Sequence, residues 1–170
     1  AVASYSKAID LKHEFAEAHS NLGITFRELG KFEEAIASQT QANLLKPDSA
    51  EAHSNLGITF QKKGKLDKAL SSYSKAIALK PDFAEAHCNL GVTLKELGRL
   101  EEAVHSYEQA IALKPEFAEA YSNMGVSLQE LGRLDDAEES YNRAIALKPV
   151  NNFFWNLHSI QKTIKDAEYW

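Results

Sequence analysis

Apolar and small residues recur at helical spacing along this chain, and the whole pattern repeats every 34 residues. The copy at 83–116 carries large apolar side chains at Leu90, Leu94, Leu100, Tyr107, Ile111 and Leu113. Small residues stand between them at Gly91, Ala103 and Ala110. Because small side chains let two helix backbones approach closely, we expect Gly91 to pack against Ala103 in the second helix of the same copy.

Each copy predicts two helices, because signals for a helix start and a helix end occur twice in it. Asp82 stands three residues before Glu85, as Asp48 does before Glu51, and this spacing is typical of a capping box. The first helix is expected to end at a glycine in the left-handed conformation, at Gly30, Gly64, Gly98 and Gly132. The second helix ends before a proline or its equivalent, which prevents continuation.

The repeat divides the chain into six segments. Four full repeats are expected at 15–48, 49–82, 83–116 and 117–150. Residues 1–14 match the second helix of a truncated repeat, and 151–170 are expected to form a capping helix or, alternatively, a degenerate repeat. One helix pair cannot bury its apolar face alone, whereas stacked pairs can. The sequence therefore predicts an all-α fold, an α-solenoid of stacked helix–turn–helix units.

The spacing of the best-defined positions is similar to that of a known family. Leu90-Gly91, Ala103, Tyr107, Ala110 and Pro115 resemble the tetratricopeptide repeat, which has the same period. The resemblance covers almost the whole chain. It implies a right-handed superhelix with the first helices on the concave face, and it implies a role in protein–protein interaction.

Composition excludes several other classes of protein. With 44% hydrophobic and 25% charged residues, the chain has the composition of an ordinary globular protein. Its net charge of −5 and the absence of a basic stripe argue against nucleic-acid binding. No apolar run approaches the roughly 20 residues of a membrane span. The single cysteine fits a reducing compartment, so we expect a cytoplasmic location.

Candidate chemistry is weak throughout. His19, His53 and His87 occupy the same position in successive repeats, but residues one repeat apart are too distant to share a metal ion, so we expect them to pack between helices. No glycine-rich phosphate loop, HExxH or CxxC string occurs. We therefore expect no catalytic residue, no metal and no cofactor.

One asparagine per repeat is the best candidate for binding. Asn21, Asn55, Asn89 and Asn123 share one position, where packing does not require an amide. An amide can donate to and accept from a peptide backbone. The series resembles the asparagine ladder in the repeat arm of the O-GlcNAc transferases. We expect the neighbouring positions to line the same peptide-binding groove, at Ser20, Ser54, Cys88, Ser122, Arg27, Gln61, Lys95 and Gln129.

The predicted function is therefore an interaction scaffold that binds an extended or helical segment of another protein. An alternative is the substrate-recruiting arm of a larger enzyme, such as a glycosyltransferase. Some tetratricopeptide repeats hold chaperone C-termini with a lysine and arginine clamp. The corresponding positions here carry glutamate, serine, asparagine and isoleucine or valine, so a chaperone-tail receptor is not expected.

A third possibility is self-assembly through the ends of the array. Tyr5 belongs to a second helix without a first helix before it, and aromatic residues decorate the expected cap at Trp155 and Trp170. Large exposed apolar patches mark interfaces. The sequence thus predicts that the chain forms homo-oligomers through one or both ends.

Overall fold

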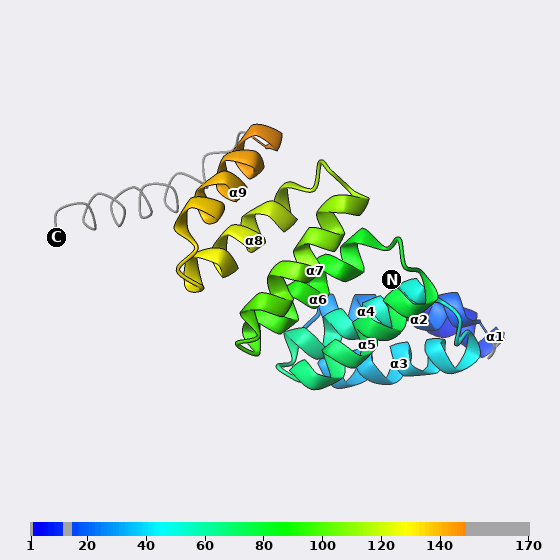
Figure 1. Cartoon of the computed structure of the whole chain (residues 1–170). Coiled ribbons are helices and arrows are strands. Elements are labelled where there is room, and N and C mark those ends of the chain that lie inside the picture. The colour runs from blue at the N-terminus through cyan, green and yellow to red at the C-terminus, as the bar shows by residue number, and fades with distance from the viewer. Residues whose placement is uncertain (1, 12–14, 149–170) are drawn as a thin grey trace.

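The computed structural model describes residues 2–11 and 15–148, and every regular element in these ranges is an α-helix. Figure 1 shows the helices following one another along an elongated stack from α1 to α9. Their bounds are α1 (Val2–Leu11), α2 (Ala16–Glu28), α3 (Phe32–Leu45), α4 (Ala50–Lys62), α5 (Leu66–Leu79), α6 (Ala84–Glu96), α7 (Leu100–Leu113), α8 (Ala118–Glu130) and α9 (Leu134–Leu147). Each of the four full 34-residue intervals contains one pair of helices. The predicted α-solenoid is confirmed.

Glycine ends each first helix, as the sequence predicts. All four turn glycines have positive φ values between 73° and 76°, which a residue with a Cβ adopts only with strain: Gly30, Gly64, Gly98 and Gly132. In the third repeat the turn is closed by the Gly98 amide, which donates to the Lys95 carbonyl at 2.9 Å, and by the Arg99 amide, which donates to Leu94. The chain can therefore reverse direction within three residues.

The predicted capping boxes are wrong by one residue. The residue at the N-cap of α6 is Phe83, so Asp82 lies outside the helix. Asp82 instead belongs to a turn after Pro81, in which the Phe83 amide donates to the Lys80 carbonyl at 3.1 Å. At α4 the N-cap is Ser49, whose Oγ accepts from the Ala52 amide at 3.2 Å. The turn after the proline shifts the helix start, and Asp48 and Asp82 do not cap it.

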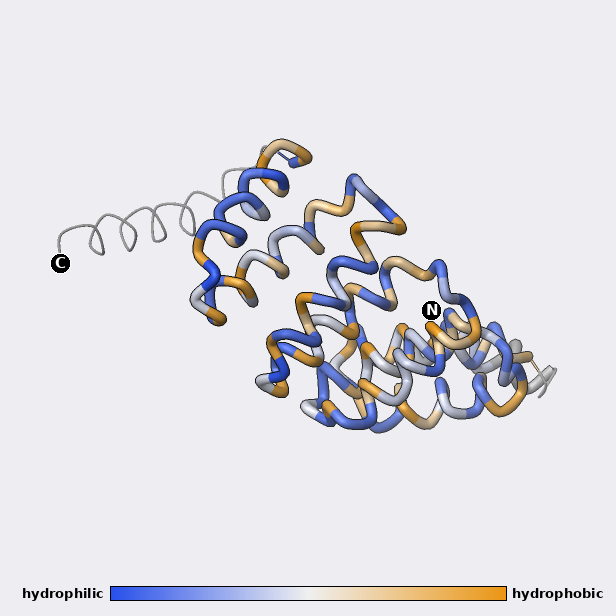
Figure 2. Tube along the Cα trace, viewed as in Figure 1, coloured by the Kyte–Doolittle hydropathy of each residue, from blue (hydrophilic) through white to orange (hydrophobic). Residues whose placement is uncertain are grey.

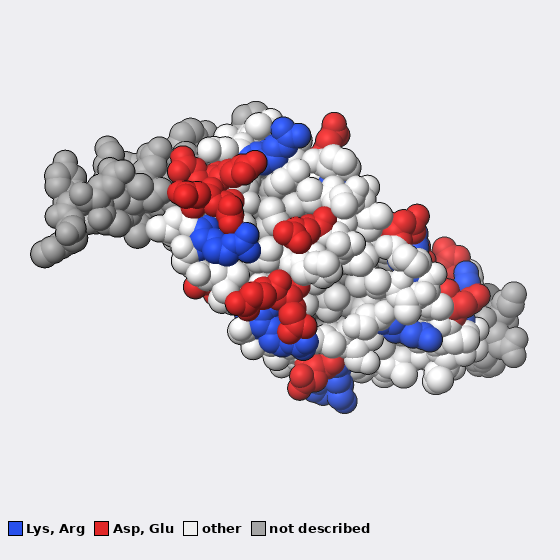
Figure 3. All heavy atoms as spheres, viewed as in Figure 1, with Lys and Arg blue, Asp and Glu red and all other residues white. Residues whose placement is uncertain are grey.

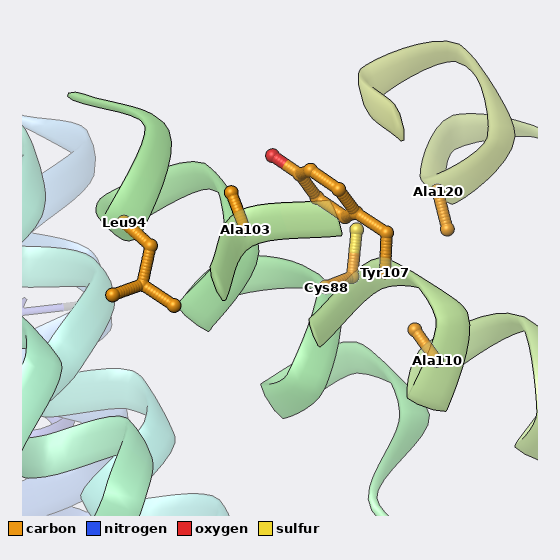
Figure 4. Packing of buried hydrophobic residues seen from close by; sticks show 6 residues of the cluster. All are labelled: Cys88, Leu94, Ala103, Tyr107, Ala110 and Ala120. Atoms are coloured by element: carbon orange, nitrogen blue, oxygen red, sulfur yellow. The ribbon is translucent and has the colours of Figure 1, made fainter. Parts of the chain in front are cut away.

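The core of the second, third and fourth repeats is built from alanines around one buried tyrosine, and Gln39 takes the place of the tyrosine in the first. Figure 4 shows the third repeat, where the ring of Tyr107 lies among Cys88, Ala103 and Ala110. A Cβ added to Gly91 would lie 2.6 Å from Cε1 of Tyr107. Gly91 therefore packs against the second helix of its own repeat, as predicted, and its nearest neighbour there is Tyr107. Figure 2 shows the resulting alternation of apolar and polar positions along every helix.

The stack bends because its two layers of helices are spaced differently. Each first helix, among α2, α4, α6 and α8, contacts the next one directly. Among the described residues, the second helices α3, α5, α7 and α9 do not contact one another. Open clefts separate them instead, one of about 390 Å³ between α5 and α7 and one of about 620 Å³ between α7 and α9. The first helices therefore form the inner, concave layer.

Candidate functional site

The exposed side of each first helix carries, in order, a glutamate, an asparagine, an isoleucine or valine, and a charged residue. In α4 these are Glu51, Asn55, Ile58 and Lys62, which lie three or four residues apart and so share one face. Glu51 and Lys62 are exposed, and Asn55 and Ile58 are half-buried between them. The same order occurs in α2, α6 and α8. We call this surface the inner face; its other members are Glu17, Asn21, Ile24, Glu28, Glu85, Asn89, Val92, Glu96, Glu119, Asn123, Val126 and Glu130.

The asparagines of the inner face use their backbone within the helix and leave most of their side chains available. The Asn55 carbonyl accepts from Oγ1 of Thr59 at 3.1 Å, and the Asn89 carbonyl accepts from Thr93 at 2.9 Å. Among the described residues no hydrogen bond engages the side-chain amides of Asn21, Asn55 or Asn89. A half-buried amide without an internal partner can donate to and accept from a bound backbone.

Sequence reasoning missed the aliphatic row beside the asparagines. Ile24, Ile58, Val92 and Val126 follow each asparagine by three residues and are half-buried on the same face. Their spacing in the printed sequence would have revealed them, because residues three apart are neighbours on a helix surface. Together the two rows combine hydrogen-bonding amides with apolar surface along the stack.

The predicted groove positions Arg27, Gln61, Lys95 and Gln129 lie at the ends of the first helices, and three of them make internal contacts. Arg27 donates from Nη1 to the Asn55 carbonyl of the next first helix at 3.3 Å. Burial lowers the pKa of this guanidinium. Gln61 accepts from the hydroxyl of Tyr73 at 3.1 Å and donates to Glu96 at 2.9 Å, and Gln129 accepts from Tyr141 at 3.2 Å. These side chains hold the layers together. Lys95 is half-buried.

The small residues before the asparagines differ in their exposure. Ser20 and Ser122 are half-buried, whereas Ser54 is 5% exposed and Cys88 is 2% exposed. Burial raises the pKa of the Cys88 thiol to about 12, so the thiol stays protonated and unreactive at neutral pH. Ser54 and Cys88 therefore present almost no surface to a ligand, and of the four positions only Ser20 and Ser122 remain candidate contacts.

Two glutamates of the inner face are paired with lysines that directly follow the second helices. Lys80 lies 3.2 Å from Glu51, and Lys114 lies 2.9 Å from Glu85. The pKa of Glu51 is lowered by a hydrogen bond from its own backbone amide and by Lys80, and the pKa of Glu85 is lowered mainly by Lys114. On the face shown in Figure 3, acidic and basic side chains lie in mixed groups without a continuous basic stripe.

The histidines make local contacts. Nε2 of His53 donates to the Pro47 carbonyl, and Nε2 of His87 donates to the Pro81 carbonyl, each at 3.0 Å. Within 2–11 and 15–148, no group of three or more histidine, cysteine or carboxylate side chains is arranged to hold a metal ion. In the same ranges every helix is too short or too polar to cross a bilayer.

Of the three residues predicted to mediate self-association, the structure describes only Tyr5. Tyr5 lies in α1 and is half-buried. Trp155 and Trp170 lie outside the described residues. Homo-oligomerisation through the ends stays a prediction.

Solved structures with the same architecture include three of particular interest. The crystal structure of MamA matches with a TM-score of 0.80 and 28% sequence identity, over 87% of this chain and 86% of that one. Pseudomonas aeruginosa PilF matches with a TM-score of 0.81 and 25% identity, over 89% and 69%. The first repeat domain of Spaghetti (RPAP3), bound to the HSP90 peptide SRMEEVD, matches with a TM-score of 0.67 and 26% identity, over 69% and 94%.

Family comparisons agree with these structures. No curated protein matches the chain significantly. The family profile described as "TPR repeat" matches residues 24–64, 60–98 and 93–132, and the profile described as "Tetratricopeptide repeat" matches residues 118–151. These matches cover well over half of the chain. The chain therefore belongs to the tetratricopeptide repeat family.

Proposed function

We propose that this protein is a non-enzymatic interaction module whose inner face binds an extended or helical segment of another protein. Tetratricopeptide repeat proteins are generally scaffolds for protein interaction. A solved relative, the first repeat domain of RPAP3, is bound to a peptide. Both facts support a peptide as the ligand class for this chain.

The observation that carries the proposal is the row of asparagine amides on the inner face. Asn21, Asn55 and Asn89 recur once per repeat on adjacent helices, half-buried, with side chains that no described residue engages. One amide per repeat can bind successive peptide groups of a segment without demanding a particular side chain. The aliphatic row beside them supplies apolar contact, which contributes about 25 cal/mol per Å² buried.

The test removes two amides and measures binding to the natural partner. The partner is first captured from the source cell with the parent protein and then titrated calorimetrically. Asn55→Ala combined with Asn89→Ala should weaken binding by roughly 5- to 150-fold, because each lost hydrogen bond is worth about 0.5–1.5 kcal/mol. Asn142→Ala, at an exposed position of α9, is the matched control and should bind normally. Full affinity in the double variant would exclude the asparagine row as the contact.

The likeness of this row to the asparagine ladder of the O-GlcNAc transferases favours a second candidate. In that case the same inner face recruits substrates for a catalytic domain elsewhere in a longer protein. The complete reading frame separates the two candidates. A catalytic domain encoded beyond Trp170 favours the substrate-recruiting arm, and a frame without one favours the independent scaffold.

A further inference from the structure

One residue interrupts an otherwise regular column of aromatic side chains. The residue at the N-cap of the first helix is phenylalanine in three repeats, at Phe15, Phe83 and Phe117, but it is Ser49 in the second. In two repeats a lysine ammonium lies over the ring, with Lys80 at 5.0 Å from the Phe83 centroid and Lys114 at 4.7 Å from that of Phe117. The equivalent lysine beside Ser49 is Lys46.

A cavity of about 230 Å³ lies where the missing ring would be. It is lined by Ala16, Glu17, Ser20, Ala42, Lys46, Ser49, Glu51 and Ala52. The fourth repeat shows how such a space is filled: Phe117 packs against the cluster that contains Cys88, Ala110 and Ala120. The equivalent residues two repeats earlier in the chain are Ser20, Ala42 and Ala52. The cavity walls thus match the walls that contact a phenylalanine ring elsewhere in the chain.

We propose that this cavity binds an aromatic side chain of the partner segment, with the Lys46 ammonium over the face of the ring. A cavity of about 150 Å³ is enough to hold benzene, so a phenylalanine ring fits the available volume. Lysine over an aromatic face is favourable by about 0.5–1 kcal/mol at exposed sites. Phe83 and Phe117, each with a lysine ammonium over its ring, show the arrangement that we expect for the bound ring. Because Ser49 has no ring of its own, the second repeat can accept one from another molecule.

The cavity opens where a bound segment would pass. Glu17 and Glu51 line the cavity and are also members of the inner face, and Ser20 stands beside Asn21. A segment held by the asparagine row can therefore place one side chain in the cavity. The cavity thus adds an aromatic residue to the segment that the proposed function requires. Only the origin of the ring in a bound partner depends on that proposed function. A free aromatic amide tests the cavity by itself.

The experiment uses two small probes and records the backbone amide resonances of Ser20, Ser49 and Ala52 by NMR. N-acetylphenylalanine amide should shift these resonances saturably, with a Kd on the order of 1 mM. N-acetylcyclohexylalanine amide has a similar shape but no aromatic face, and it should bind roughly two- to fivefold more weakly. Lys46→Met should remove this difference between the probes.

Filling the cavity from within supplies the decisive variant. Ser49→Phe should abolish the shifts caused by N-acetylphenylalanine amide, whereas Ser49→Ala, which keeps the cavity open, should retain them. Thermal unfolding of both variants verifies that they fold. Shifts that persist in Ser49→Phe, or their absence in the parent, overturn the proposal. Concentration-dependent shifts of the same amides without a probe would assign the cavity to a second copy and also overturn it.

The test is independent of the asparagine row. Asn55→Ala with Asn89→Ala should leave binding of the free probe unchanged while it weakens binding of the natural partner. Loss of probe binding in Ser49→Phe with normal partner affinity in the asparagine variant would reject the proposed function and keep the cavity. Probe binding that persists in Ser49→Phe, together with weakened partner binding in the asparagine variant, would reject the cavity and keep the proposed function.

Discussion

Gln61 accepts a hydrogen bond from the buried hydroxyl of Tyr73 at 3.1 Å, twelve residues further along the chain. Gln129 and Tyr141 repeat this pair at 3.2 Å in the fourth repeat. The third repeat departs from the pattern, because the residue twelve before Tyr107 is a lysine. The hydroxyl of Tyr107 is buried without a hydrogen-bond partner among the described residues. One repeat thus lacks an interaction that its neighbours possess.

Restoring the missing pair should stabilise the protein. Lys95→Gln places an acceptor where Gln61 and Gln129 have theirs, whereas lysine is only a donor. We expect the free energy of unfolding to rise by about 0.5–1.5 kcal/mol, measured by chemical denaturation. Lys95→Met is the matched control, since it removes the charge without providing the acceptor. Equal stabilisation by methionine would show that the charge, and not the hydrogen bond, was responsible.

The close approach of the two helices in a repeat depends on the glycine that faces the tyrosine. Gly91→Leu should lower the free energy of unfolding by about 1–3 kcal/mol or more, because the added carbons overlap the fully buried ring of Tyr107. Urea denaturation measures the loss. Gln109→Leu adds the same side chain on the exposed side of α7 and should change little. An unchanged midpoint for Gly91→Leu would refute the packing assignment.

Most of the fold follows from the sequence because each repeat marks its own helix ends. The four turn glycines have the left-handed conformation that their spacing predicts. The error at Asp82 has a local cause, since the turn after Pro81 consumes one more residue than a capping box allows. The contact between Gly91 and Tyr107 joins positions sixteen residues apart on two helices. It depends on the angle at which those helices pack, which places the tyrosine ring in the space beside the glycine.

The candidate site was predictable in part. Helical periodicity alone places Asn55 on an exposed face, and it would also have placed Ile58 there. The internal hydrogen bonds of Gln61 and Arg27 were not predictable, because they depend on which neighbouring helix each long side chain reaches. The cavity beside Ser49 is marked in the sequence only as an exception among phenylalanines. That this cavity can hold a ring is seen only from the residues that phenylalanine contacts in another repeat.

Alkaline pH should unfold the protein through its buried tyrosines. Burial raises the pKa of the Tyr73 and Tyr107 hydroxyls, and raises that of Tyr141 to about 12. An unfolded tyrosine ionises near pH 10, so the unfolded chain releases its protons first as the pH rises. Stability is therefore complete below about pH 10 and falls above it. Tyrosinate absorbance from these residues should appear together with the loss of helical circular dichroism. Ionisation of all six tyrosines near pH 10 with helices intact would contradict the assignment.

The first full repeat carries glutamine where the other three carry the buried tyrosine, and this difference predicts a site for stabilisation. Gln39 is 1% exposed, and its Nε2 has no hydrogen-bond partner among the described residues. A buried donor without a partner costs about 1–3 kcal/mol. Its Oε1 lies 2.6 Å from Oγ1 of Thr59, whose single hydroxyl hydrogen can also reach the Asn55 carbonyl at 3.1 Å, so the threonine keeps an acceptor when the glutamine is replaced.

Gln39→Tyr should therefore raise the free energy of unfolding by about 1–2 kcal/mol, because it removes the unpaired donor and buries an aromatic ring. The space exists in principle, since Gly23 faces position 39 as the later glycines face their tyrosines. The hydroxyl would point toward Arg27, twelve residues earlier, which can donate to it. The reciprocal change Tyr73→Gln should destabilise the second repeat, and chemical denaturation of both variants measures the pair. A lower midpoint for Gln39→Tyr would mean that the first repeat has no room for a tyrosine at position 39, unlike the other three repeats.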